Sequence, residues 1–356
     1  MALRRRMRYA GAMGNDFGGP GEGAAMTRPM RLADLAALAG VSTSTVSRAL
    51  AGHSSVNVAT RDRIQALARE HDVRPNQLAR NLRLRSTGAI GLALPLGHAK
   101  TQHLTDPFFL TLLGFLADGL VERGYDILLS RVIPEANDWL DRLVDSGRID
   151  GLLLVGQSDQ YDTIERVAGR YGPLVVWGVN RPGQRHVTIG SDNILGGRIA
   201  AEHLIARGRR RLLFLGDPAP PEFGERHQGF VAAAGEAGLE VELLSTAVEP
   251  DAVRASLGAR LARGVAPDGI FAVSDVAAMS ALAALAERGL DVPRDVGIVG
   301  YDDVTLAAHT SPPLTTIRQD LALGASLMVE RLLRRIEGEA APSAVVVPEL
   351  VVRGST

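Results

Sequence analysis

A short polar segment near the N-terminal end of the chain carries side chains that could read the edges of DNA bases. Thr43, Ser44, Ser47 and Arg48 are spaced so that, on a helix, all four face outward. Arginine can donate two hydrogen bonds to guanine, and hydroxyl groups can bond to bases or phosphates. These residue types at this spacing predict a recognition helix that lies in a DNA major groove.

The residues around this segment have the sizes that a helix-turn-helix requires. An apolar stripe at helical spacing runs from Leu32 to Ala39, and Gly40 can end that helix. The small Ala36 lets two helices cross closely, and Thr45 and Val46 begin the buried face of the next helix. On this segment alone, an ordinary pair of packed helices is the alternative interpretation.

Charge is divided unevenly along the chain. Residues 1–85 contain 14 arginines and 6 acidic residues, a net charge of +8, so the remainder carries −9 within a total of −1. A basic module on an acidic body is expected when only the module contacts phosphate. No stretch approaches the roughly 18 apolar residues of a membrane span, and no export signal is evident, so we expect a cytoplasmic protein without a membrane partner.

The sequence does not indicate an enzyme. The nucleophile-elbow, P-loop and dinucleotide-binding patterns are absent, and His98, His103 and His227 lack metal-ligand spacing. With no cysteine, disulfides and thiolate zinc sites are excluded. Gly196 and Gly197 open a predicted helix without completing the dinucleotide pattern, which favours a packing role. We expect no catalytic residues, no cofactor and no metal.

Beyond residue 87, short apolar runs alternate with amphipathic helical stretches, which predicts mostly parallel, doubly wound sheets in two lobes. The predicted strands are 89–94, 126–129, 151–155, 174–177, 211–215, 269–273 and 296–299. The predicted helices include 108–123, 195–207, 224–237 and 276–288. Before them, residues 1–29 are glycine-rich and are expected to form a disordered tail, and Asn57 can cap a third short helix that runs to about His71.

Several motifs occur in the order and spacing of a known family. VSTSTVSRAL, VNVATRDRI and RPNQLARNLR follow one another in the N-terminal part. DPFF at residues 106–109, SDN at 191–193, ERHQGF at 225–230, VGYDD at 299–303 and PPLTTIRQD from Pro312 continue the series. Nearly everything beyond residue 30 resembles the lactose/galactose repressor family of transcriptional regulators.

The resemblance implies DNA-binding roles for individual residues. Thr43, Ser44 and Arg48 would be the base-reading positions of the recognition helix, and Thr60 and Asn76 would contact phosphates. These implied roles agree with the outward-facing set found from the residue pattern.

Residues 77–84 resemble the family's hinge helix. Leu82 would insert into a minor-groove base step and kink the DNA, while Ala79 would allow close approach. A helix this short is unstable alone in water, so we expect it to order only against DNA and its dimer partner. Arg31 and Val73 depart from common family residues, which leaves phosphate contacts at those two positions open.

The remainder resembles the periplasmic sugar-binding proteins, whose two lobes close on a ligand at the carboxyl ends of their strands. Three crossovers would join the lobes, so each lobe is discontinuous in sequence. We expect a helix-turn-helix domain at 30–75, a hinge and linker at 76–87 and a core at 88–356, with an N-lobe of about 88–190 and 318–342 and a C-lobe of about 191–317 and 343–356.

Polar side chains at strand ends on both sides of the cleft are what a polyhydroxylated ligand needs, because each buried hydroxyl must find a partner. Our effector-binding candidates are Asp106, Phe108, Trp177, Asp192, Arg226, Ser274 and Asp302. By the resemblance, Arg226 is the ligand-contacting arginine and Asp302 the first acid after the GY pair. Trp177 could stack on a sugar ring or belong to the core, and Phe108 could line the cleft mouth or begin a helix.

Together these features predict a repressor of carbohydrate-utilisation genes that binds a pseudo-palindromic double-stranded operator and responds to a sugar or glycoside effector. We expect a homodimer, or a tetramer. A purine- or nucleoside-responsive repressor or activator of the same family is the alternative, and a sugar-binding protein without DNA function is a weaker one. The motifs do not indicate whether the effector releases DNA or promotes its binding.

Overall fold

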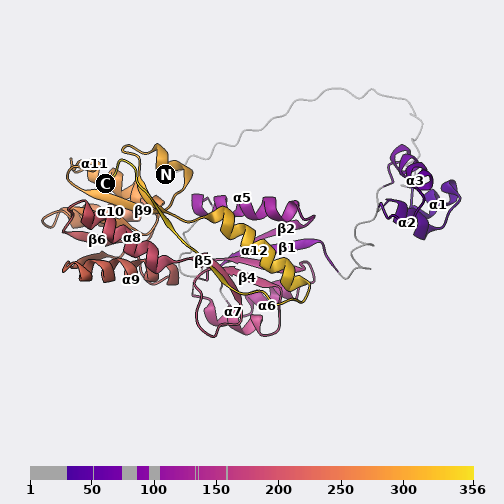
Figure 1. The fold of residues 1–356 in the computed structure, drawn as a ribbon, viewed down its shortest axis with the longest axis horizontal. Helices are drawn as coiled ribbons and strands as arrows, with labels where there is room; N and C mark the ends of the chain where they lie inside the picture. The colour runs from indigo at the N-terminus through magenta and orange to yellow at the C-terminus, as the bar shows by residue number, and fades with distance from the viewer. Residues whose placement is uncertain are drawn as a thin grey trace, which may run out of the picture. The chain divides into compact units, whose positions relative to one another are not determined.

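The computed structural model describes residues 30–50, 52–73, 86–95, 105–132, 134, 136–157 and 159–356. The chain divides into two compact units, residues 1–80 and 81–356, and each is described here by itself (Figure 1). The predicted tail at 1–29 and the predicted hinge helix at 77–84 lie outside the described residues.

The first unit contains three helices around a small core of its own. These are α1 (Leu32–Ala39), α2 (Thr43–Leu50) and α3 (Val58–Glu70). Gly40 takes the left-handed conformation with φ of 61° and ends α1, and the Asn57 side chain accepts a hydrogen bond from the Ala59 N–H to begin α3. Both of these predictions are confirmed. Leu35, Val46 and Ile64, one from each helix, are fully buried against one another.

The N-lobe of the second unit is a six-stranded parallel sheet with the strand order β11-β5-β4-β3-β1-β2. Its strands are β1 (Ala89–Pro95), β2 (Asp126–Val132), β3 (Gly151–Val155), β4 (Leu174–Trp177), β5 (Val187–Ser191) and β11 (Ala344–Val346). The helices α5 (Pro107–Val121) and α12 (Leu321–Ile336) share one hydrophobic core with the sheet, and α6 (Trp139–Val144) and α7 (Tyr161–Ala168) share another. The central strands are apolar throughout because both faces of the sheet are covered.

The C-lobe repeats this arrangement in the order β12-β10-β9-β8-β6-β7, with only β12 antiparallel among the described strands. Its strands are β6 (Leu212–Leu215), β7 (Val241–Leu244), β8 (Gly269–Ala272), β9 (Gly297–Asp302), β10 (Thr315–Arg318) and β12 (Glu349–Val351). Its helices are α8 (Asn193–Ala206), α9 (Pro221–Glu236), α10 (Pro250–Leu261), α11 (Asp275–Ala286) and the 3₁₀ helix η1 (Thr305–His309). Figure 1 shows α8 and α9 on one side of the sheet and α10 and α11 on the other. The predicted two-lobed, mostly parallel core is confirmed, and each predicted strand and helix lies within three residues of its observed bounds.

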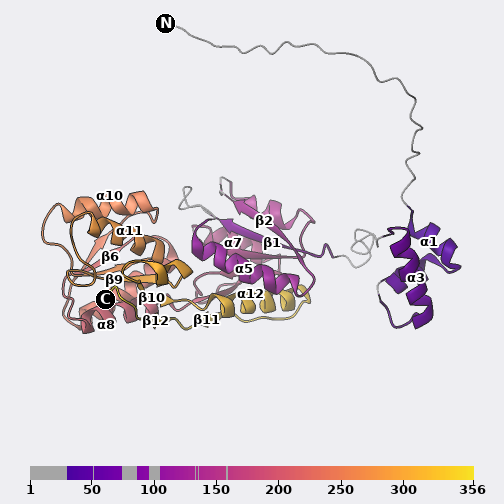
Figure 2. The same ribbon diagram turned by 90° about the horizontal axis from the view of Figure 1, so that it is seen from above.

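The chain crosses between the lobes three times (Figure 2). The first crossing follows β5, the second lies between β10 and α12, and the third lies between β11 and β12. We expected the C-lobe to resume at residue 343, and this boundary is wrong because Ala344–Val346 pairs with β5 in the N-lobe sheet. Pro348 interrupts the apolar run, since proline cannot donate to a strand ladder, and only the residues after it reach the C-lobe.

Helices α8 and α9 pack backbone to backbone through glycines. A Cβ atom at Gly197 would lie 2.0 Å from the Arg226 carbonyl oxygen, and one at Gly229 would lie 1.9 Å from that of Ile194. At Gly196 a Cβ atom would lie 2.7 Å from the Tyr301 ring. The predicted packing role of the Gly196–Gly197 pair is confirmed, and the close approach sets the position of the Arg226 backbone.

We predict that Gly229→Ala lowers the free energy of unfolding by about 1–3 kcal/mol, because the added methyl group overpacks the α8–α9 contact. Urea denaturation followed by circular dichroism measures this change. Gly235→Ala is the matched control on the same helix, where a Cβ atom would meet nothing within 4 Å. It should leave stability unchanged or raise it by up to about 1 kcal/mol. Equal stability of both variants and the wild type would contradict the packing role.

Candidate functional site

The outward face of α2 carries the predicted base-reading residues. Thr43, Ser44 and Arg48 are exposed and Ser47 is partly exposed, while Val46 and Ala49 point into the core of the first unit. The Arg48 Nε donates a hydrogen bond to the Ser44 carbonyl oxygen at 3.3 Å, which leaves the rest of the guanidinium at the surface. The geometry therefore presents hydroxyl and guanidinium groups together on one exposed helix face.

The other predicted DNA-contacting residues fall in two classes. Thr60 lies in the first turn of α3 and is partly exposed. Asn76, Ala79 and Leu82 lie outside the described residues, so their predicted roles stay predictions. Val73 is buried in the core of the first unit and presents no polar group there.

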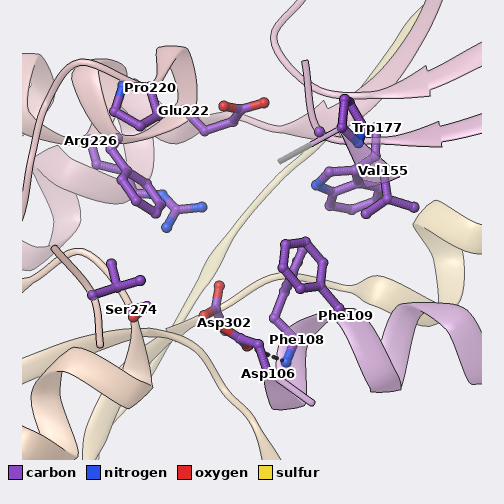
Figure 3. A pocket seen from close by; sticks show the side chains of 14 residues that line it. Asp106, Phe108, Phe109, Val155, Trp177, Pro220, Glu222, Arg226, Ser274 and Asp302 are labelled. Atoms are coloured by element: carbon purple, nitrogen blue, oxygen red, sulfur yellow. Dashed lines mark hydrogen bonds between the residues drawn. The ribbon is translucent and has the colours of Figure 1, made fainter. Parts of the chain in front are cut away.

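A cavity lies between the two lobes of the second unit (Figure 3). It contains about 710 Å³ of empty space, part of it open to solvent. The lining residues are Pro95, Asp106, Phe108, Phe109, Val155, Gly156, Trp177, Pro220, Glu222, Phe223, Arg226, Val248, Ser274 and Asp302. Six of the seven predicted effector-binding residues are among them, and Asp192 is not.

Arg226 places a buried positive charge in the cavity wall. Its side chain projects from α9, and the residue is 5% exposed. Its Nε donates to the Asn193 Oδ1 at 2.9 Å, and its Nη1 donates to the Val273 carbonyl oxygen at 2.5 Å. The guanidinium carbon lies 3.6 Å from the centre of the Tyr301 ring, a cation–π contact. These contacts fix the guanidinium so that it faces the cavity in one orientation.

Asp302 faces the same space from the end of β9. It is the last residue of that strand, has φ of 118°, and is buried. Burial raises the pKa of its carboxyl well above the usual range, and the nearby Arg226 offsets part of the effect. Its Oδ1 accepts a hydrogen bond from the Gln319 Nε2 at 2.7 Å. Because Gln319 lies in the second crossing between the lobes, this hydrogen bond connects the cavity to that crossing.

Aromatic side chains form the N-lobe side of the cavity. Trp177 ends β4, is 4% exposed, and lies with its ring centre 6.1 Å from that of Phe108. Phe108 is in the first turn of α5, and its ring centre is 5.4 Å from that of Phe109. A Cβ atom at Gly324 would lie 2.3 Å from the Trp177 ring, so α12 covers the tryptophan from behind. Trp177 is therefore both a core residue and a cavity residue.

Known proteins match both units of the chain. A family model for bacterial regulatory proteins of the lacI family matches residues 31–76, and one for a periplasmic binding protein-like domain matches residues 201–356. The transcriptional repressor PurR of Pasteurella multocida (strain Pm70) is 30% identical over 335 residues, which are 90% of this chain and 97% of that protein. The chain belongs to the lacI family of bacterial regulatory proteins. It is a DNA-binding transcriptional regulator of that family.

Two solved structures of lacI-family proteins align with almost the whole chain. A complex of the transcriptional regulator CelR with cellobiose is 30% identical, has a TM-score of 0.67, and matches 92% of this chain and 100% of its own. The lac repressor dimer bound to operator and the anti-inducer ONPF is 26% identical, has a TM-score of 0.81, and matches 92% and 99%. In the described part of this lacI-family chain, no helix is long and apolar enough to cross a membrane, and no group of histidines and acids is arranged to hold a metal ion.

Three of the predicted effector-binding residues also begin helices. The side chains of Asp106, Asp192 and Ser274 accept hydrogen bonds from backbone N–H groups of α5, α8 and α11 respectively. For Asp106 and Ser274 this capping role accompanies a place in the cavity wall. Asp192 lies in the first crossing between the lobes, where it caps α8, and it is not part of the cavity wall.

The prediction from sequence missed Glu222. It lies four residues before Arg226, one helical turn earlier on α9, and lines the same cavity. That helical spacing was visible in the sequence, but an acid in the first turn of a helix is commonly explained by the helix dipole. The Oε1 atom of Glu222 is buried and has no hydrogen-bond partner among the described residues, a property that depends on tertiary packing.

Behind the cavity, Asp275 is a buried carboxyl group that holds neighbouring backbone in place. It accepts hydrogen bonds from the Thr316 hydroxyl at 2.5 Å and from the Val304 N–H at 2.9 Å. Burial raises its pKa from 3.8 to about 7, although these two hydrogen bonds favour the ionised form. The folded state therefore binds a proton more tightly than the unfolded chain does.

We predict that Asp275 makes stability depend on pH between about 4 and 7. Its favourable contribution is complete below the unfolded pKa of 3.8 and is lost as the pH rises through the folded value of about 7. Asp275→Asn should therefore gain Tm relative to the wild type as the pH rises from 5 to 8, measured by scanning calorimetry. Asp295→Asn, at an exposed acid whose pKa is lowered, is the control and should show a constant difference over this range. A Tm difference for Asp275→Asn that does not vary with pH would contradict the prediction.

Proposed function

We propose that this lacI-family regulator is a repressor whose operator binding is controlled by a neutral carbohydrate in the cavity between its lobes. The observation that carries the proposal is that the cavity combines aromatic side chains from the N-lobe with hydrogen-bonding side chains from the C-lobe. Trp177, Phe108 and Phe109 form an aromatic side on the N-lobe, and Arg226, Ser274 and Asp302 form a polar side on the C-lobe. Sugars combine apolar C–H faces that stack on aromatic rings with hydroxyls that need hydrogen-bond partners.

Charge in the cavity favours an uncharged ligand. Asp106, Glu222 and Asp302 oppose an anion, and the fixed guanidinium of Arg226 opposes a cation. The CelR relative, which is similar over almost its whole length, has been solved in complex with cellobiose. These points support regulation of carbohydrate-utilisation genes. We propose as well that the cavity binds and releases its ligand without turnover.

We propose that a homodimer binds the operator in the cytoplasm, as the lac repressor dimer does in its complex with operator. In that arrangement the exposed face of α2 in each protomer lies in the major groove of one half-site. The side chains that contact bases are Thr43, Ser44, Ser47 and Arg48, with Thr60, Asn76, Ala79 and Leu82 completing the interface with DNA.

We propose that the effect of ligand binding is transmitted from the cavity to the DNA-binding unit through the N-lobe. At one end, the Asp302–Gln319 hydrogen bond joins the cavity to the second crossing. At the other end, the Asp150 carboxylate holds the residues at which the linker enters β1. It accepts hydrogen bonds from the N–H groups of Thr87 and Gly88 at 2.6 and 2.8 Å and from the Ser86 hydroxyl at 2.5 Å. Lobe movement would therefore be transmitted to the linker through a fixed attachment.

We predict that Arg48→Ala removes discrimination between operator and unrelated DNA, while Arg226→Lys removes the response to effector. Loss of a bidentate base contact costs about 1–3 kcal/mol of discrimination. Lysine keeps the charge at 226 but lacks the planar guanidinium whose separate Nε and Nη1 donors bond to Asn193 and Val273. Fluorescence anisotropy with an operator duplex and a scrambled duplex, each with and without cellobiose and related neutral sugars, measures both properties.

Arg69→Ala on α3 is the control for loss of one arginine from the DNA-binding unit, and it should keep operator discrimination. If Arg48→Ala lost effector binding along with operator discrimination, the proposed division between the two units would be wrong. If the wild type ignored every sugar tested and responded to nucleobases, the carbohydrate assignment would be replaced by a purine effector.

We predict that Asp150→Asn weakens the coupling between effector and DNA without changing effector affinity. Burial acts to raise the pKa of Asp150, but hydrogen bonds from Ser86, Thr87 and Gly88 outweigh it and hold the pKa below its usual value. Removal of the charge loosens this attachment, and the effector-induced change in operator affinity should fall by about fivefold or more. Calorimetry gives the effector affinity and anisotropy gives the operator affinity. Asp145→Asn, at a surface ion pair with Arg170, should behave as the wild type, and identical coupling in both variants would refute the role of Asp150.

A further inference from the structure

Glu222 projects into the cavity from the first turn of α9. Figure 3 shows its carboxyl group extending from the side of the cavity that carries Arg226 toward the side that carries Trp177. It is one of three acids in the cavity wall, and the other two have described hydrogen bonds. Asp106 accepts from the Phe108 N–H at 2.9 Å, and Asp302 accepts from the Gln319 amide at 2.7 Å.

One carboxyl oxygen of Glu222 differs from those of Asp106 and Asp302 that accept these hydrogen bonds. Oε1 is buried and has no hydrogen-bond partner in the described part of the chain. Burial raises the pKa of this carboxyl, and the nearby positive charge of Arg226 offsets only part of the effect. A buried acceptor without a partner destabilises the folded protein, and such atoms are rare in native structures. A ligand in the cavity that donates a hydrogen bond would remove this cost.

The same carboxyl group also reaches the opposite lobe. The backbone of Gln157, which follows β3 in the N-lobe, lies near the Glu222 carboxyl group, which belongs to the C-lobe. Gln157 is itself firmly held, because its amide donates to the Val179 carbonyl oxygen at 2.8 Å and lies 3.1 Å from the His186 ring nitrogen. The Glu222 carboxyl group therefore lies beside a rigid part of the N-lobe.

We propose that Glu222 is a specificity-determining residue whose free Oε1 accepts a hydrogen bond from a hydroxyl group of the effector. This inference rests on the proposed function and specifies the effector further. A ligand that lacks a donor at this position leaves Oε1 buried and unpaired, so it binds weakly even when it fits the cavity. A hydroxyl fits better than an ammonium group because the guanidinium of Arg226 opposes a second positive charge in the same space.

The test uses the full chain in three forms, the wild type, Glu222→Met and Glu236→Met. Methionine at 222 keeps an unbranched side chain and removes the acceptor. Glu236 is an exposed acid on the same helix, paired with Arg198 at the surface, and serves as the control. Isothermal calorimetry measures binding of cellobiose, glucose and methyl glucoside as neutral probes and of glucosamine as a cationic probe. Thermal unfolding without ligand measures the effect of each substitution on the folded protein.

We expect the wild type to bind at least one neutral probe, and Glu222→Met to bind it about tenfold more weakly or worse, as for loss of a hydrogen bond to a charged group. Glu236→Met should bind within about twofold of the wild type. Without ligand, the Tm of Glu222→Met should equal or exceed that of the wild type, because an unpaired buried carboxyl is removed.

Other outcomes separate this inference from the proposed function. Equal binding by Glu222→Met and the wild type would overturn the role of Glu222 and leave carbohydrate control intact. A lower ligand-free Tm for Glu222→Met would show that the carboxyl is already satisfied within the protein, which also overturns the inference. Binding of glucosamine in preference to every neutral probe would overturn the hydroxyl assignment. Failure of the wild type to bind any of these sugars would overturn the proposed function and this inference with it.

Discussion

The C-lobe is arranged around one buried guanidinium group. Taking a charge out of water costs on the order of several kcal/mol unless hydrogen bonds replace its hydration, and Arg226 obtains them from Asn193 and from the Val273 carbonyl oxygen. The Tyr301 ring covers the face of the guanidinium. These contacts require α8 and α9 to lie at backbone distance, which glycine at 197 and 229 permits, and the Tyr301 ring to lie against α8, which glycine at 196 permits. The position of the Arg226 charge therefore depends on these three glycines as much as on the groups that bond to the guanidinium.

The sequence predicted the architecture where the physical signal is local. Strands such as Gly151–Val155 and Leu174–Trp177 are buried on both faces, so their apolar runs are uninterrupted and their ends are easy to place. The two edge strands of the C-lobe sheet gave no such signal. The strand Val241–Leu244 contains the exposed Glu242, and Glu349–Val351 is only three residues long. Assignment of residues 344–346 to a lobe was wrong because a three-residue apolar run does not specify which of two sheet edges it joins.

Some cavity residues could likewise be predicted from the sequence and others could not. Trp177, Ser274 and Asp302 could be predicted because the carboxyl ends of parallel strands meet at one edge of a sheet, and six of the seven candidates line the cavity. Asp192 follows a strand as well, but it caps α8 in a crossing between the lobes. Glu222 was missed for the opposite reason. Its sequence position is ordinary for a helix start, and only the packing of the two lobes makes one of its oxygens buried and unpaired.

Control of DNA binding by the cavity requires a coupling free energy of only about 1–3 kcal/mol. A hydrogen bond to a charged group contributes about 1.5–3 kcal/mol, so a single such bond made in one lobe arrangement and broken in the other is sufficient. The three hydrogen bonds that Asp150 accepts from residues 86–88 and the one that Asp302 accepts from Gln319 are therefore strong enough to keep both ends of the path attached during the change. The hydrogen bond that differs between the two lobe arrangements must then involve a group whose partner binds and leaves. The free oxygen of Glu222 meets that condition.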